Sequence, residues 1–252
     1  MIQITLLGTG NVATHLFKVF HTSDNVKINQ VYNHKEASLS PFKNLVKTTT
    51  KLEELEESDI FIVALKDDFM EETIKKIAKP TRLIAHSSGS LPLLQENCRN
   101  AVFYPLQTFS KNTAVDFTEI PLCLETEFEK DYAILENLAK SISKKVFSIS
   151  TSQRKSLHLS AVFVCNFVNH LYSIGEDLCK ENQVPYSILT SLITETAQKA
   201  TKNSPAQVQT GPAIRNDRET INRHLSQLSS ANFKEIYTLL TQSIQDKHGK
   251  KL

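Results

Sequence analysis

The sequence has little excess charge of either sign, no segment resembling a secretion signal and no apolar run of membrane-spanning length. Its 252 residues have a formal net charge of only +2, which gives no electrostatic reason to expect nucleic acid or a membrane surface as the main partner. The first residues lack the basic segment and long apolar run of a signal peptide. No stretch approaches the roughly 18 to 20 apolar residues that span a bilayer. These absences predict a cytoplasmic protein with neither nucleic acid nor membrane as partner.

Cysteine is sparse as well. The four cysteines are far apart in the chain, form no CxxC pair and have no cluster of histidines beside them. Structural zinc sites and disulfide frameworks depend on matched spacings of these residues. The sequence therefore predicts reduced thiols and no metal site at Cys98, Cys123, Cys165 and Cys179.

The chain has two parts with different patterns. The first part, to about residue 150, alternates β-rich and helical segments, which predicts an α/β domain on a mostly parallel, doubly wound sheet. Its strands are expected at 2–7, 27–32, 59–65, 82–85, 101–104, 121–124 and 145–148, and its helices at 11–21, 68–78 and 129–143. The second part has only helical patterns, at 152–182, 185–202, 217–229 and 232–246. We therefore predict an α/β domain over residues 1–150 and an all-α C-terminal domain over residues 151–252.

The turn after the first strand has the composition of a phosphate-binding loop. Residues 8–13, Gly-Thr-Gly-Asn-Val-Ala, match the pattern G-x-G-x-x-G/A between a buried strand and an amphipathic helix. In that pattern Gly8 allows the tight turn, Gly10 lets the backbone approach a pyrophosphate, and Ala13 permits close helix–strand packing. Backbone N–H groups and the helix dipole then hold the anion. A purely structural turn is the alternative, but the context favours a Rossmann domain that binds a dinucleotide through Gly8, Thr9, Gly10, Asn11 and Val12.

The end of the second strand favours NADP over NAD. NAD-binding domains place an acidic residue about 20 residues after the turn, where it binds the ribose hydroxyls. Here that position is Asn33-His34-Lys35, which contains no carboxylate. His34 and Lys35 could pair with a 2′-phosphate instead, whereas Glu36, which could serve NAD, is expected to start the next helix.

Two further strand ends contribute candidate cofactor contacts, since ligands bind outside the carboxyl ends of the strands in such sheets. Leu65 and Lys66 close the third strand, and Lys66 either reaches the ribose or phosphates or is a solvated lysine. His86, Ser87 and Ser88 close the next strand. Their polarity suits the nicotinamide end of the cofactor, although serine-rich turns are also common without function.

Six segments resemble one bacterial family, which pairs a Rossmann-like NADP-binding domain with a helical C-terminal domain of unknown function. They are Leu-Leu-Gly-Thr-Gly-Asn-Val-Ala (6–13), Ala-Leu-Lys-Asp-Asp (64–68), His-Ser-Ser-Gly (86–89), Tyr-Pro-Leu-Gln-Thr-Phe (104–109), Ala-Val-Phe-Val-Cys-Asn-Phe (161–167) and Thr-Gly-Pro-Ala-Ile-Arg-Asn-Asp (210–217). That family is similar to pyrroline-5-carboxylate reductase, ketopantoate reductase and the deazaflavin-dependent NADP reductases. The resemblance implies a small-molecule substrate between the two domains and a homodimer joined by its helical domains.

The sequence departs from these relatives at two positions. The family usually has histidine where Tyr104 stands. The related hydroxyacid and ketopantoate enzymes have Lys-x-x-x-Asn on the first long helix, and here Asn166 matches the asparagine while Val162 replaces the lysine. The lysine proton donor of those enzymes is therefore missing.

Other polar residues could supply the chemistry. His158, Val162 and Asn166 recur at four-residue spacing, which predicts one shared helix face. His158 is either a general acid or a histidine satisfied in the core or at the surface, and Asn166 either joins a buried network or binds substrate. In the loop 210–217, Arg215 would suit a substrate carboxylate, while Asp217 is either part of the site or the N-cap of the next helix.

The leading functional hypothesis is an NADP(H)-dependent oxidoreductase that reduces a small carbonyl or imine compound. His158, Asn166 and Arg215 are its predicted catalytic residues, and the hydride would arrive near residues His86, Ser87 and Ser88. Because the lysine is missing, a non-catalytic NADP(H)-binding sensor or regulatory protein is the alternative. A Rossmann sheet that binds nothing is a third hypothesis.

Overall fold

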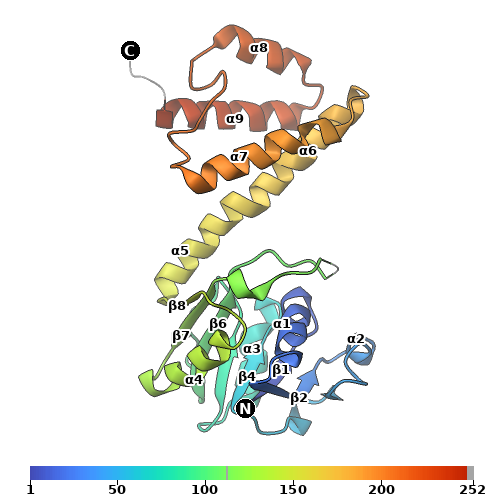
Figure 1. Cartoon of the computed structure of the whole chain (residues 1–252), viewed down its shortest axis with the longest axis vertical. Helices are drawn as coiled ribbons and strands as arrows, with labels where there is room; N and C mark the ends of the chain where they lie inside the picture. The colour runs from blue at the N-terminus through green and yellow to red at the C-terminus, as the bar shows by residue number, and fades with distance from the viewer. Residues whose placement is uncertain (112, 249–252) are drawn as a thin grey trace. The chain divides into compact units, whose positions relative to one another are not determined.

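Two compact units make up the chain, Met1–Asn166 and Phe167–Leu252, and each is described by itself. The structure is a computed structural model that describes residues 1–111 and 113–248 (Figure 1). In that part of the chain the strands all lie in the first unit, and the second unit is helical. The predicted order of an α/β domain followed by an all-helical part is confirmed.

The first unit is built on one sheet with the strand order β3-β2-β1-β4-β5-β6-β7-β8. These strands are β1 (Ile2–Leu7), β2 (Val26–Tyr32), β3 (Lys47–Thr49), β4 (Ile60–Val63), β5 (Leu83–His86), β6 (Arg99–Pro105), β7 (Leu122–Thr126) and β8 (Val146–Ser148). All neighbours are parallel except β6 and β7, which are antiparallel. The chain runs outward from β1 through β2 and β3 and then returns to pair β4 with the other side of β1. This reversal creates the switch point at which doubly wound sheets bind ligands.

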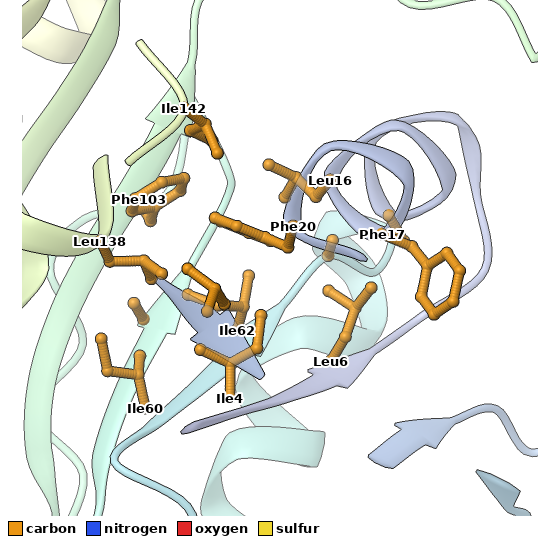
Figure 2. Close-up of a cluster of buried hydrophobic side chains, with 14 of the residues drawn as sticks. Ile4, Leu6, Leu16, Phe17, Phe20, Ile60, Ile62, Phe103, Leu138 and Ile142 are labelled. Carbon is orange, nitrogen blue, oxygen red and sulfur yellow. The ribbon is translucent and has the colours of Figure 1, made fainter. Parts of the chain in front are cut away.

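Helices cover both faces of this sheet. The helices of the unit are α1 (Asn11–His21), α2 (Glu36–Leu39), α3 (Asp67–Ile77), α4 (Glu129–Lys140) and α5 (Thr151–Ala161). Ile4 and Leu6 of β1 share one buried cluster with Phe20 of α1 and Leu138 of α4 (Figure 2). Leu7 points the other way and joins a second cluster with α3. Strands buried on both faces are typical of parallel sheets, and each fully buried large apolar side chain contributes about 1.5–3 kcal/mol.

Two features of the first unit differ from the sequence-based expectation. Strand β3 was not predicted, because its three residues at the edge of the sheet are too few to show a period. The units divide after Asn166 rather than at residue 150. The reason is that α5 belongs to the first unit, since Arg154 near its start is fully buried.

One continuous helical stretch, Thr151–Glu181, contains a π-helical segment at Val162–Phe167. By length and composition alone this stretch could cross a membrane, whereas the sequence-based expectation was that no segment is long enough. None of its most apolar part is buried. A π-helix bonds each N–H to the carbonyl five residues earlier instead of four. The π turns therefore rotate Asn166 away from the face that an α-helical spacing from His158 predicts.

The second unit consists of helices, with a long connection over residues 203–217 between the second and third of them. They are α6 (Val168–Glu181), α7 (Thr190–Lys202), α8 (Arg218–Gln227) and α9 (Ala231–His248), with a 3₁₀ turn at Tyr186–Leu189. Asp217 caps α8, because its side chain accepts from the N–H of Thr220 at 3.1 Å, so the capping interpretation of this residue is confirmed. Within residues 167–248, none of these four helices contains a buried residue.

Candidate active site

The turn between β1 and α1 depends on Gly8. This glycine has a φ of +121°, and a Cβ placed on it would lie 2.3 Å from the carbonyl oxygen of Ala64. Its own N–H donates to the carbonyl of Tyr32 at 2.9 Å. Only glycine combines this conformation with so close an approach to β4, so the turn is fixed against the carboxyl ends of β2 and β4.

Gly10, unlike Gly8, has open space around it, since a Cβ placed on it would meet no atom within 4 Å. It is the N-cap of α1 and provides no side-chain cap for the first helical turn. The N–H groups of that turn are therefore available to an anion, and the positive end of the helix dipole favours one. The side chain of Asn11 donates to the carbonyl of Phe109 at 2.9 Å, which connects the segment after β6 to this turn. The open cradle at Gly10 fits the diphosphate of a dinucleotide.

The end of β2 lies beside the same turn. The Asn33 amide donates to the Thr9 hydroxyl at 2.8 Å, and its oxygen accepts from the N–H of Lys35, also at 2.8 Å. His34 and Lys35 are exposed, whereas Glu36 starts α2 and forms an ion pair with Lys43. The strand end thus offers two basic side chains and no unengaged carboxylate, which suits a 2′-phosphate.

The end of β4 completes the cofactor side of the sheet. A Cβ at Gly8 would lie 3.4 Å from Cδ2 of Leu65, so this side chain adjoins the phosphate turn. Lys66 is exposed at the N-cap of α3. Both residues therefore lie at the predicted edge.

The loop after β5 is fixed by His86 and Ser88. The His86 ring is 1% exposed, lies 3.0 Å through Nε2 from the carbonyl of Pro92, and accepts from the N–H of Ser88 at Nδ1. Burial lowers the pKa of His86 to about 4, so the ring is neutral at pH 7. The Ser88 hydroxyl accepts from the N–H groups of Ser90 and Leu91, each at 3.1 Å. These side chains hold the loop, and a cofactor would meet its backbone and the half-buried Ser87.

A tyrosine and a histidine meet beyond this loop. The hydroxyl of Tyr104, near the end of β6, and Nδ1 of His158, on α5, lie 3.0 Å apart. Tyr104 is 8% exposed, and burial raises its pKa to about 12. A Cβ at Gly89 would lie 2.6 Å from Nδ1 of His158 and 2.8 Å from Cζ of Tyr104. The loop after β5 therefore passes directly against both rings, and we call these two residues the Tyr–His pair.

The sequence did not reveal this pair. His158 was a predicted catalytic residue, but Tyr104 was noted only because it replaces a histidine. One signal was present, since a tyrosine in a buried strand needs a partner for its hydroxyl. The pattern could not show that the partner would come from a helix 54 residues further along the chain.

The remaining predicted catalytic residues lie elsewhere. Asn166 is exposed in the π-helical segment, so it joins no buried network within its unit. Arg215 is exposed in the loop before α8, in the second unit. In residues 1–111 and 113–248 no group of three or more His, Cys, Asp or Glu side chains could hold a metal ion.

Comparisons with known proteins place this site in a family. Residues 3–86 match the family described as NADP oxidoreductase, coenzyme F420-dependent, and residues 120–244 match a domain of unknown function, DUF2520. A candidate NADP oxidoreductase from Bacteroides fragilis is 38% identical, with a TM-score of 0.89 over 97% of this chain and 98% of that chain. The chain belongs to this family of NADP oxidoreductases. NADP is its cofactor, and the family resemblance stated from the sequence is confirmed.

More distant structures share the fold of this oxidoreductase. An imine reductase from Myxococcus stipitatus in complex with NADP+ is 15% identical, with a TM-score of 0.65 over 98% of this chain and 96% of that one. Pyrroline carboxylate reductase from Plasmodium falciparum with NADP bound is 14% identical, with a TM-score of 0.59 over 98% and 97%. A comparison with curated proteins gives no match.

Proposed function

We propose that this oxidoreductase reduces a small imine or carbonyl compound with NADPH and that Tyr104 donates the proton. The observation that carries the proposal is the 3.0 Å contact between the Tyr104 hydroxyl and Nδ1 of His158. The pair lies beside the loop that closes β5, at the carboxyl edge of the parallel strands. It supplies an acid in a chain that has Val162 where related enzymes have lysine.

The protein's own part in the reaction is to hold and move a proton. The chemistry that bound NADPH supplies is a hydride for the substrate carbon. The electron pair released from the C=N or C=O double bond takes the proton of Tyr104, whose high pKa keeps the phenol protonated at neutral pH. His158, half-buried on α5, then returns a proton from solvent to the tyrosine oxygen through Nδ1.

The predicted cofactor and substrate contacts belong to the same proposal. The turn from Gly8 to Val12 would bind the diphosphate, His34 and Lys35 the 2′-phosphate, and the loop 86–88 the nicotinamide end. Asn166 would position the substrate, and Arg215 would suit a carboxylate on it because guanidinium and carboxylate form paired hydrogen bonds. A small carboxylated imine or ketone is therefore the preferred substrate class.

A panel of small cyclic imines, ketones and keto acids, with and without a carboxylate, tests this function. We expect at least one member to oxidise NADPH in a protein-dependent reaction, and carboxylated members to react best. NADPH absorbance measures the rate, and the same panel with Tyr104→Phe protein is the control. Tight NADPH binding without turnover of any member would contradict the reductase and favour the sensor.

We also propose that a second copy of the chain covers the helical unit. A helix in a folded unit normally buries an apolar face, yet helices α6, α7, α8 and α9 bury no residue within 167–248. Large apolar side chains are exposed in this unit, among them Leu171, Ile188, Leu192, Leu239 and Leu240. Charged residues such as Glu195 and Lys199 of α7 lie among them, which suits a protein interface better than lipid. A homodimer in the cytoplasm accounts for this surface.

The proposed homodimer predicts the molecular mass of the protein in solution. The wild-type protein should sediment with twice the 28.4 kDa of one chain, and Leu192→Glu or Leu239→Glu should shift it towards the monomer by burying a charge in the interface. Leu45→Glu, at an exposed leucine of the first unit, is the matched control and should remain dimeric. A wild-type monomer, or protein that partitions onto lipid vesicles, would contradict the proposal.

A further inference from the structure

The start of α5 is fixed to the sheet by an ion pair between a buried arginine and a half-buried glutamate, which has no part in the roles described so far. The guanidinium of Arg154 is fully buried and pairs through Nη1 with the carboxylate of Glu125 on β7. Its Nη2 donates to the carbonyl of Leu91 at 2.6 Å. Burying the charge of Arg154 removes it from water at a cost in free energy, so the pair is weak evidence for a purely stabilising role.

Glu125 also holds the first turn of α5. Its Oε1 accepts from the N–H and from the hydroxyl of Thr151, each at 2.8 Å. The Thr151 hydroxyl in turn accepts from the N–H of Leu93 at 3.1 Å. One network thus joins the end of β7, the segment 91–93 and the beginning of α5.

The Tyr–His pair lies on or beside the segments that this network joins. His158 lies one helical turn after Arg154 on α5. Strand β7 pairs with β6, where Cys123 lies opposite Tyr104, and a Cβ placed on Gly89, shortly before Leu91, would overlap both rings. One network therefore holds the helix that carries His158 and the strand that pairs with the strand of Tyr104.

The charge of Arg154 acts on the pair as well. Its guanidinium lowers the pKa of Tyr104 and of Cys123, in opposition to burial, which raises both. A cation in a low-dielectric interior stabilises a nearby anion more strongly than a solvated cation does. Among the buried side-chain polar atoms of the described residues, only Nε of Arg154 lacks a hydrogen-bond partner. The guanidinium of Arg154 is therefore buried although one of its N–H groups makes no hydrogen bond.

We propose that Arg154, held by Glu125, is a positioning residue that fixes His158 against Tyr104 and stabilises the phenolate left after proton transfer. The inference rests on the proposed role of the Tyr–His pair. As the hydride bonds to the substrate carbon, the O–H bond of Tyr104 breaks and its proton bonds to the substrate nitrogen or oxygen. The phenolate is short-lived, because His158 returns a proton to it.

Arg154→Met and Arg154→Lys test this role, with Arg99→Met as the matched control. Arg99, at the far end of β6 from Tyr104, also forms an ion pair in which one partner is buried, the carboxylate of Asp131. With a substrate from the panel, Arg154→Met should slow hydride transfer about 100-fold and raise its solvent isotope effect. Arg154→Lys should recover at least about tenfold, and the Kd for NADPH should change by less than about twofold.

A second readout needs no turnover. The His158 ring signals in proton NMR, assigned with His158→Gln, should move in Arg154→Met protein in the direction that Tyr104→Phe moves them. Arg99→Met should leave them unchanged. If Arg154→Met does not fold, Glu125→Gln takes its place, because it keeps the shape of the side chain and removes the charge that holds the guanidinium.

The two readouts separate the inference from the function on which it rests. An unreactive wild-type protein whose His158 signals respond to Arg154→Met would contradict the reductase but support the positioning role. Folded Arg154→Met protein with unmoved His158 signals would overturn the inference, whatever the wild-type activity. A rate loss in the Arg99→Met control equal to that of Arg154→Met would overturn it too.

Discussion

Gly10→Val protein is expected to fold normally and to bind NADPH at least about 100-fold more weakly than the wild type. The backbone of Gly10 is in the extended region, which valine adopts readily. No atom lies within 4 Å of the new Cβ in the protein alone. The added side chain would instead occupy the place that the cofactor's diphosphate needs at the start of α1. Titration of NADPH fluorescence measures the affinity, and urea unfolding measures the stability.

Gly8→Ala is the matched control, because the two glycines lie in the same turn with opposite surroundings. Its Cβ would lie 2.3 Å from the carbonyl oxygen of Ala64 at a φ of +121°, so strain and overlap should lower the free energy of unfolding by about 2–4 kcal/mol. Gly10→Val should change that free energy by less than about 1 kcal/mol. Wild-type NADPH affinity in Gly10→Val protein would show that the cofactor binds elsewhere.

Tyr104→Phe protein is expected to transfer hydride about 10²- to 10⁴-fold more slowly, the usual contribution of a positioned acid. The substitution removes only the hydroxyl, 3.0 Å from Nδ1 of His158, and leaves the ring in its strand. NADPH affinity should be unchanged, because the phosphate turn and the end of β2 are untouched. Single-turnover oxidation of bound NADPH with a reactive panel member separates the hydride step from binding.

Gly89→Ala should produce a similar loss without removing any polar group. The new methyl would lie 2.6 Å from Nδ1 of His158 and 2.8 Å from Cζ of Tyr104, so at least one of the two rings must shift, and we expect their contact to be lost. Gly175→Ala in α6 is the control, since its Cβ would have Tyr186 no closer than 4.0 Å, and it should keep the wild-type rate. Full activity in Tyr104→Phe or Gly89→Ala protein would refute the proton-donor role.

The parts of the fold that follow from local patterns were predictable from sequence. The buried runs of β1 and β4 and the amphipathic α1 have periods that a few neighbouring residues reveal. The phosphate turn was predictable because its glycines serve backbone geometry, which depends on local sequence. Strand β3 was not, because three residues at a sheet edge leave no periodic signal.

The Tyr–His pair and its support depend on contacts between segments far apart in the chain. The composition of residues 86–88 suggested a polar nicotinamide site. In the structure, however, both nitrogens of the His86 ring form hydrogen bonds with backbone groups of the loop after β5. The π-helical segment likewise changes the face on which Asn166 lies, and no residue in it marks the change in hydrogen bonding. No feature of the helical pattern over 152–182 distinguishes Arg154, because only the sheet beneath it makes it buried.

Label transfer from NADPH deuterated at C4 measures the proposed reaction most directly. With a reactive imine or keto acid, mass spectrometry should find one deuterium on the reduced carbon when one of the two C4 positions is labelled. The proton on nitrogen or oxygen should come from solvent, and Tyr104→Phe should slow the appearance of the labelled product. If NADPH binds at the Gly8–Gly10 turn and neither C4 position delivers its deuterium to any substrate of the panel, the protein is not the reductase proposed here.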